Sequence, residues 1–162
     1  MIELRKSVTE FPKRNLNFNY LSLFIPAING EAFIYVKSLL DTDILFSKEY
    51  LQFKGEGVVT VITLYEFITI IRRRHIDTLK TGNKSRAEGY IKFLNLVIAD
   101  IKDSILEINK NDILDAVNLV FDRNIDVGDA INTIVARRIN SKIVSKDKDY
   151  ERVKDLAEVI LP

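Results

Sequence analysis

The amino-acid sequence predicts an α/β fold in which helices cover both faces of a parallel sheet. From Val36 onward, short apolar runs alternate with segments whose apolar residues recur at helical spacing, which is the pattern of strand–helix–strand units. The runs at 38–40 and 58–62 are continuously apolar or β-branched, as expected for parallel strands that are buried on both faces. We therefore expect a three-layer α/β/α sandwich around a parallel sheet.

The other elements are assigned from periodicity and from residues that end helices. A short helix is expected at 43–53, ending near Gly55 and Gly57, and a longer one at 63–74. The pattern then predicts helices at 84–99, 111–122 and 128–138, a short helical turn near 150–155, and strands at 105–108, 142–145 and 157–161. In the helix at 111–122, the expected core residues are Leu114, Val117, Leu119 and Val120.

Residues 1–35 do not follow this alternation, and we expect them to form an extension to an α/β domain that spans 36–162. The extension has a basic start, an Asn-rich piece and an apolar run at 20–28 that Pro26 interrupts. This pattern is not that of a secretory signal peptide, and no run approaches the roughly 18 apolar residues of a transmembrane helix. An alternative is that native translation starts near Val36.

The composition excludes several classes of protein. A chain of 162 residues fits one domain, and the absence of cysteine excludes disulfides and thiolate metal sites. Because the formal net charge is only +1, nucleic acid would have to be attracted by local basic patches. We expect a soluble, cytoplasmic protein without a membrane partner.

Four acidic residues stand where a predicted strand ends or a predicted helix begins: Asp41, Glu66, Asp129 and Asp147. The carboxyl ends of parallel strands share one edge of the sheet, where α/β folds place their ligands. The four side chains are therefore expected to converge. Clustered carboxylates repel one another unless a cation compensates, and ligands that are all oxygens select a hard ion, Mg²⁺ or Mn²⁺, rather than zinc.

Each of these residues also has a structural explanation. Asp41 can cap the helix that follows it, and Glu66 can complete a capping box with the threonine three residues before it. Asp129 can interact with the dipole of the helix that it opens, and Asp147 lies in a polar turn from which Asp149 can cap a short helix. A residue can both cap a helix and bind a ligand, so the sequence leaves both roles open.

Four segments of the chain, in this order and at these separations, resemble the signature segments of PIN domains: "LLDTDIL", "TLYEF", "GDAINTIVA" and "IVSKDKDY". More narrowly, they are similar to the VapC-type ribonuclease toxins of prokaryotic toxin–antitoxin pairs. The resemblance spans roughly 36–162 and implies a PIN-like α/β/α sandwich. It also implies an endoribonuclease that depends on Mg²⁺ or Mn²⁺, is commonly a homodimer, and is often silenced by a cognate antitoxin.

The resemblance also implies roles for individual residues. The family's four acidic positions match Asp41, Glu66, Asp129 and Asp147; the first, third and fourth are expected to bind metal, and Glu66 to complete the shell or orient the attacking water. The residues expected to support the site are Asp43, Thr63, Ser145 and Asp149. Tyr150 stands where phenylalanine is usual, a difference that is not expected to affect the chemistry. The extension at 1–35 departs from the family, whose members usually begin almost at the first strand.

A basic segment at 72–86 would supply cations for an RNA backbone. Its first three residues, Arg72, Arg73 and Arg74, are the predicted RNA-binding residues, because phosphate contacts of this kind give affinity without sequence information. A solvated helix end explains the same pattern. His75 is given no catalytic role.

Two other functions fit parts of the pattern. "DTDIL" resembles the start of a haloacid dehalogenase-type phosphatase, with Asp41 as nucleophile and Asp43 as acid/base. However, Leu45 stands where that family has threonine or valine, and Thr133 stands where it has a second acid. The other alternative is a PIN fold that binds RNA or protein without cleaving, and the presence of all four acids argues against it.

Overall fold

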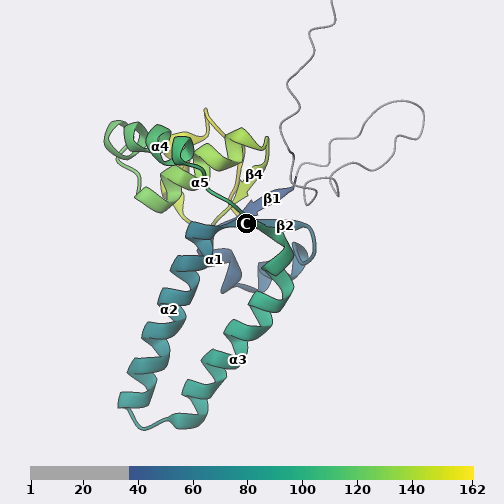
Figure 1. Ribbon diagram of the computed structural model, residues 1–162, viewed down its shortest axis with the longest axis vertical. Coiled ribbons are helices and arrows are strands. Elements are labelled where there is room, and N and C mark those ends of the chain that lie inside the picture. Colours follow the sequence, from purple (N-terminus) through teal and green to yellow (C-terminus); the bar gives the residue numbers. More distant parts are fainter. Residues whose placement is uncertain (1–36) are drawn as a thin grey trace, which may run out of the picture. The chain divides into compact units, whose positions relative to one another are not determined.

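The computed structural model describes residues 37–162, so the extension predicted at 1–35 lies outside the described residues (Figure 1). Five parallel strands form one sheet in the order β3-β2-β1-β4-β5. The strands are β1 (Ser38–Leu40), β2 (Gly57–Thr60), β3 (Ile105–Leu106), β4 (Lys142–Val144) and β5 (Val159–Ile160). The predicted parallel α/β fold is confirmed.

Helices connect the strands and cover the sheet. The α-helices are α1 (Thr42–Leu45), α2 (Val61–Lys80), α3 (Lys84–Ile101), α4 (Lys110–Asp122) and α5 (Val127–Arg138). Within residues 37–162, 3₁₀ turns lie at η2 (Lys48–Gln52), η3 (Lys102–Ser104) and η4 (Lys148–Val153), the last of them between β4 and β5. The helices α2 and α3 form an antiparallel hairpin (Figure 1), and the turn between them uses Gly82 at φ +78°, where a glycine is needed.

Both faces of the sheet are buried, which is why its strands read as continuous apolar runs. Successive residues point to opposite faces, so Leu39 packs with α4, α5 and η4 in one core cluster. Leu40 packs with α1, α2 and α3 in the other. These two clusters separate the three layers of the sandwich.

The start of α2 differs from the prediction. Thr60 caps this helix, since its Oγ1 accepts a hydrogen bond from the Thr63 amide at 3.1 Å, and Val61 and Ile62 are helical although β-branched residues favour strands. The predicted capping box between Thr63 and Glu66 is therefore wrong. Glu66 lies in the second turn of α2, free of any capping role. The helix predicted at 43–53 is likewise two short elements, α1 and η2.

The helix α4 turns a different face inward from the one predicted. Leu119 and Val120 do pack against the core, but Leu114 is 61% exposed and Val117 is 46% exposed. The buried positions include Asp112, because an arginine of α5 pairs with its carboxylate. With Asp112 on the inward face, an apolar stripe of α4 faces solvent.

No helix within residues 37–162 is long and apolar enough to cross a membrane.

Candidate active site at the carboxyl edge of the sheet

Asp41 follows β1 and is almost completely buried, at 6% exposure. Its Oδ1 accepts a hydrogen bond from the Thr42 amide at 2.8 Å, so it caps α1, and its Oδ2 accepts one from the Ser145 hydroxyl at 2.7 Å. This second bond follows from the sheet register, since β1 pairs with β4 and Leu40 lies opposite Val144. The residue that follows each strand is thereby brought to the same edge.

The loop after β4 brings a second pair of acids to this edge. Asp43 Oδ2 accepts a hydrogen bond from the Lys146 amide at 2.7 Å, and the Asp147 amide donates to Ser145 Oγ at 2.9 Å. Asp147 Oδ1 accepts from the Asp149 amide at 2.8 Å and caps η4. The expected Asp149 cap is therefore wrong.

Asp149 instead forms an ion pair with Arg152, with Oδ1 and Nη2 at 3.1 Å. Its carboxylate is thus neutralised by a neighbour, unlike that of Asp147.

Glu66 is joined to the same edge by α1 and α5. The Thr42 hydroxyl donates to Glu66 Oε2 at 2.7 Å. On the other side, the Glu66 carboxylate lies against Gly128 of α5, where a Cβ would displace Glu66 Oε1 and meet Ile62. Because Asp129 comes next in the chain, the same contact carries it toward Glu66.

The pKa values show that the predicted acids are close together. Burial, then the charges of Asp41, Asp147 and Glu66, raise the pKa of Asp129 from its ordinary 3.8 to about 7. Burial also raises the pKa of Asp41 to about 6, with further contributions from Asp43 and Glu66, while hydrogen bonds from Ser145 and Thr42 oppose the rise. Charge repulsion among the carboxylates therefore adds to the effect of burial on these two pKa values.

These acids have no ion-pair partner within residues 37–162. Lys146 is near Asp43, but its Nζ pairs with Glu49 Oε2 at 2.8 Å. One carboxylate oxygen, Asp43 Oδ1, is buried and has no hydrogen-bond donor. Across the same described residues, no three His, Cys, Asp or Glu side chains are arranged as a ready-made metal site.

Two residues at the site were not recognised in the sequence. The Tyr150 side chain is completely buried and hydrogen-bonds to Asp129, which lowers the pKa of that carboxyl. Asn132 Nδ2 donates to the Tyr150 hydroxyl at 3.4 Å, and Asn132 Oδ1 accepts from Thr60 Oγ1 at 2.6 Å. The hydroxyl that distinguishes this tyrosine from phenylalanine thus contacts the site, and its effect on the chemistry stays a prediction. Asn132 could have been found, because it lies one helical turn after Asp129.

The predicted supporting residue Thr63 belongs to this buried network rather than to the acidic edge. Its hydroxyl accepts from Asn132 Nδ2 at 3.2 Å. It therefore connects the start of α2 to α5 and fixes the helix that carries Glu66.

The three predicted RNA-binding arginines are exposed but do not form one patch. Consecutive helical residues point about 100° apart. Arg73 lies seven residues after Glu66 and therefore on the same face of α2, about 10 Å from it along the axis. The guanidinium of Arg74 instead stacks over the Phe46 ring, 4.6 Å from its centroid.

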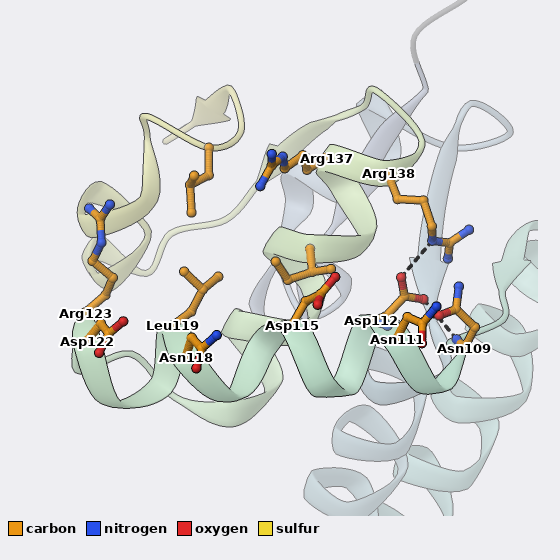
Figure 2. A pocket seen from close by; sticks show the side chains of 12 residues that line it. Asn109, Asn111, Asp112, Asp115, Asn118, Leu119, Asp122, Arg123, Arg137 and Arg138 are labelled. Atoms are coloured by element: carbon orange, nitrogen blue, oxygen red, sulfur yellow. Dashed lines mark hydrogen bonds and ion pairs between the residues drawn. The ribbon is translucent and has the colours of Figure 1, made fainter.

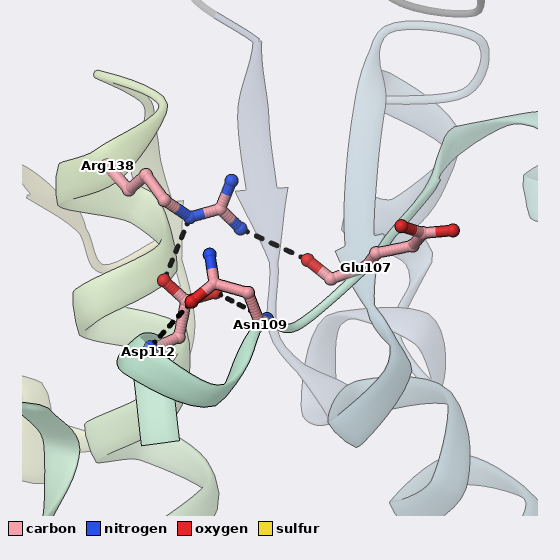
Figure 3. A network of polar contacts seen from close by, with 4 residues as sticks. All are labelled: Glu107, Asn109, Asp112 and Arg138. Atoms are coloured by element: carbon pink, nitrogen blue, oxygen red, sulfur yellow. Dashed lines mark hydrogen bonds and ion pairs between the residues drawn. The ribbon is translucent and has the colours of Figure 1, made fainter. Parts of the chain in front are cut away.

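A hollow of about 750 Å³ lies elsewhere, between α4 and α5 (Figure 2). Its charged residues are three aspartates and three arginines: Asp112, Asp115, Asp122, Arg123, Arg137 and Arg138. Arg138 is held by Asp112 and by the Glu107 carbonyl (Figure 3). Because its charges balance, this hollow is a poorer site for an anionic substrate than the acidic edge with a bound cation.

The comparison with protein families decides the assignment. Residues 31–156 match the family model of the PIN domain. The chain belongs to the PIN-domain family. PIN domains are generally nucleases and typically use divalent metal ions. No curated protein matches the chain.

Solved structures resemble this PIN domain in fold. PAE2754 from Pyrobaculum aerophilum has a TM-score of 0.60 and 15% identity, covering 79% of this chain and 85% of that one. VapBC-5 from Mycobacterium tuberculosis, of the VapBC family of toxin–antitoxin systems, has a TM-score of 0.54 and 17% identity, covering 77% and 96%. A toxin–antitoxin complex from Klebsiella pneumoniae has a TM-score of 0.50 and 17% identity, covering 76% and 96%. At these identities the likeness establishes the fold alone.

Proposed function

We propose that this chain is a metal-dependent endoribonuclease whose site is the acidic edge formed by Asp41, Glu66, Asp129 and Asp147. The observation that carries the proposal is a group of acids without a compensating cation: burial first, and then the charges of the neighbouring acids, raise the pKa of Asp129 to about 7 and that of Asp41 to about 6. Uncompensated acids of this kind do not stabilise the fold, so a group of them in a PIN domain supports a functional role. We assign the activity to the domain predicted at 36–162.

The residues at this edge fit a hard divalent cation. Every candidate ligand is a carboxylate oxygen, which favours Mg²⁺ or Mn²⁺, and Asp43 Oδ1 is buried without a donor. Asp41, Asp129 and Asp147 would hold the cation, with Asp43 in support. When bound, such an ion stabilises the charge that develops on a phosphodiester and lowers the pKa of water.

The neighbouring groups orient these carboxylates. Ser145 donates to Asp41 and Thr42 donates to Glu66, both at 2.7 Å, so one oxygen of each acid is fixed by a hydroxyl. Glu66, which has no capping role, is the group that we propose orients the attacking water. The Tyr150 hydroxyl hydrogen-bonds to Asp129 and lowers the pKa of its carboxyl.

The test is cleavage of a labelled single-stranded RNA by purified protein in Mn²⁺, in Mg²⁺ and in chelator. Asp129→Asn should reduce the rate by about a hundredfold or more, because several kcal/mol of charge stabilisation depend on the metal ligands. Asp126→Asn is the matched control, since Asp126 precedes the same helix, is exposed and makes no capping hydrogen bond with its side chain. Equal rates for the two variants would show that this edge is not the active site.

The same assay separates the alternatives. A PIN fold that only binds would retain RNA in chelator and in Mn²⁺ without cutting it. The phosphatase alternative is disfavoured by membership of the PIN family, and Thr133 uses its hydroxyl to bond the Asp129 carbonyl at 2.7 Å rather than supplying an acid. A small phosphoester should therefore not be hydrolysed.

We further propose that the chain is the toxin of a type II toxin–antitoxin pair and acts in the cytoplasm. The support is its similarity in fold to VapBC-5 and to the Klebsiella pneumoniae toxin–antitoxin complex. Induced expression in a bacterial host should arrest growth, and Asp129→Asn should abolish the arrest. The antitoxin would then be identified as the protein that co-purifies with the inactive variant.

We also propose that the chain forms a homodimer through α4. Four apolar residues form an exposed stripe on this helix: Ile113 at 49%, Leu114 at 61%, Val117 at 46% and Phe121 at 81%. Such a stripe indicates an interface. Two copies packed antiparallel about Val117 would set Ile113 against Phe121 and bring the Lys110 end of one helix to the Asp122 end of the other.

Sedimentation tests this interface. The wild type should sediment as a dimer, and Phe121→Glu should sediment as a folded monomer, because Phe121 contributes no buried contact to the single chain. A monomeric wild type would contradict the proposal.

A further inference from the structure

A second hollow, of about 390 Å³, lies where the end of α1 meets the α2–α3 hairpin. Its lining includes three aromatic rings, two arginines and one glycine: Phe46, Tyr90, Phe93, Arg74, Arg86 and Gly89. No member of this set belongs to the acidic edge. The hollow is therefore a separate site, and its lining indicates what it would bind.

The walls combine flat apolar surfaces with guanidinium groups. The Phe46 and Phe93 rings have centroids 6.1 Å apart, and the Arg74 guanidinium lies 4.6 Å from the centroid of Phe46. Neither Arg74 nor Arg86 forms an ion pair with any residue in the range 37–162. Stacking surfaces beside free guanidiniums are what single-stranded nucleic acid uses.

Gly89 keeps this hollow open. It lies in the interior of α3, where glycine is less stable than alanine. A Cβ at this position would meet nothing within 4 Å, so packing in the single chain does not require glycine here. Because glycine has no side chain, the part of the hollow next to Gly89 stays open.

The charge around the hollow favours a polyanion. Residues 72–92, which include the tip of the hairpin, hold seven lysines and arginines against two acids, a formal charge of +5, whereas the whole chain carries only +1. Two of these cations, Arg74 of α2 and Arg86 of α3, line the hollow itself. His75 Nδ1 and the Ala87 carbonyl, 2.9 Å apart, join the two helices next to these arginines.

We propose that this hollow binds one unpaired base of the RNA substrate, stacked against the Arg74 guanidinium and the aromatic side chains beside it, with Arg86 on an adjacent phosphate. The proposal rests on the ribonuclease function proposed above and adds a subsite to it. The hollow is close to the acidic edge, because Asp43 and Phe46 are three residues apart, about 4.5 Å along a helical turn. A base bound here would set which phosphodiester reaches the carboxylates.

An apolar side chain of an acidic peptide is the rival occupant. Such a peptide would use the aromatic wall but would need no flat guanidinium above a ring. The stacked Arg74 and the +5 charge of the segment 72–92 favour a base with its phosphates.

The test fills the hollow without unfolding the helix. Gly89→Leu adds a side chain to the hollow and should raise the melting temperature, since leucine favours a helix. Asn95→Leu is the control, because Asn95 is exposed on α3 and does not line the hollow. Binding is measured in chelator, where no cleavage occurs, to a labelled octamer of adenylate and to the same octamer with abasic nucleotides.

The expected result is that Gly89→Leu weakens binding of the adenylate octamer about tenfold, the scale of one stacked base, and leaves the abasic octamer unaffected. Asn95→Leu should bind both as the wild type does. Equal affinity of Gly89→Leu and wild type for the adenylate octamer would overturn the base subsite.

A second outcome would also overturn it. If Gly89→Leu loses binding of a pentapeptide of four glutamates around one phenylalanine but keeps the adenylate octamer, the hollow is a peptide site. Failure of the nuclease proposal is separate, because it would appear as absence of RNA cleavage in Mn²⁺ whatever the binding data show.

Discussion

The two ends of α5 differ in the surroundings of the aspartate that lies there: one aspartate pairs with an arginine, and the other is surrounded by acids. At the C-terminal end, Asp112 of α4 is 2% exposed and pairs with Arg138, Nε and Oδ1 being 2.9 Å apart (Figure 3). Its other oxygen accepts from the Asn109 amide at 2.9 Å and completes a capping box. At the N-terminal end, Asp129 has the charges of Asp41, Asp147 and Glu66 around it.

This difference in surroundings is consistent with a structural role for Asp112 and with the ligand-binding role that we propose for Asp129. The buried carboxylate of Asp112 is neutralised by one cation and accepts one further hydrogen bond from a backbone amide, which limits the cost of desolvation. At the acidic edge, where we propose that a cation binds, the carboxylates have no such partner, and we expect the metal-free protein to be less stable as a result. The predictions below test this contrast, from the largest expected effect to the smallest.

Replacing aspartate by asparagine should have opposite effects on stability at position 112, next to the C-terminal end of α5, and at position 129, at its N-terminal end. Both oxygens of Asp112 accept from donors, so an amide in Asp112→Asn would face a donor with its own NH₂. Loss of the ion pair as well should cost about 3 kcal/mol of unfolding free energy. Asp129→Asn removes a repelling charge and should leave stability unchanged or higher. Urea denaturation of the two variants measures this, and equal destabilisation would contradict the contrast.

Metal should stabilise only through the acidic edge. Mn²⁺ at a hundredfold excess over its dissociation constant should stabilise the wild type by about 2.7 kcal/mol. Asp41→Asn should gain much less, whereas Asp126→Asn should gain the full amount. Thermal melts in chelator and in Mn²⁺ give the comparison. The same gain in Asp41→Asn as in the wild type would place the stabilising cation elsewhere.

The metal-free protein should lose stability as the pH rises. The folded-state pKa of Asp129, about 7, lies above its ordinary value of 3.8, so its contribution is fully present below pH 3.8 and is lost as the pH rises through 7. Between pH 5 and pH 8 the loss should be on the order of 2 kcal/mol. Denaturation of wild type and Asp129→Asn at both pH values isolates this group. A variant with the wild-type pH dependence would show that Asp129 titrates normally.

Tyr150→Phe should have the smallest effect on stability and a measurable effect on the site. It removes one buried hydroxyl that bonds Asn132 and Asp129, a loss of about 1 kcal/mol. Because that hydroxyl also stabilises ionised Asp129, the variant should bind Mn²⁺ more weakly. Calorimetric titration checks the affinity, and unchanged affinity would leave Tyr150 a packing residue.

The sequence determined the order of the elements and the placement of the acids. Continuous apolar runs specify strands buried on both faces, and residues that follow paired strands, such as Asp41 and Ser145, must then meet at one edge. That argument needs only the spacing of apolar residues along the sequence and the parallel direction of the strands. The spacing is a local property, and the parallel direction follows from the helices that connect the strands.

Only the tertiary structure decided which face each helix buries and which polar groups meet. The sequence predicted Leu114 and Val117 in the core, but they are exposed, and the inward face of α4 carries Asp112, which pairs with Arg138, 26 residues away. Likewise, the contact of Tyr150 with Asp129 joins residues on different elements. Such contacts depend on how helices rotate and approach one another, and periodicity along a single helix does not contain that information.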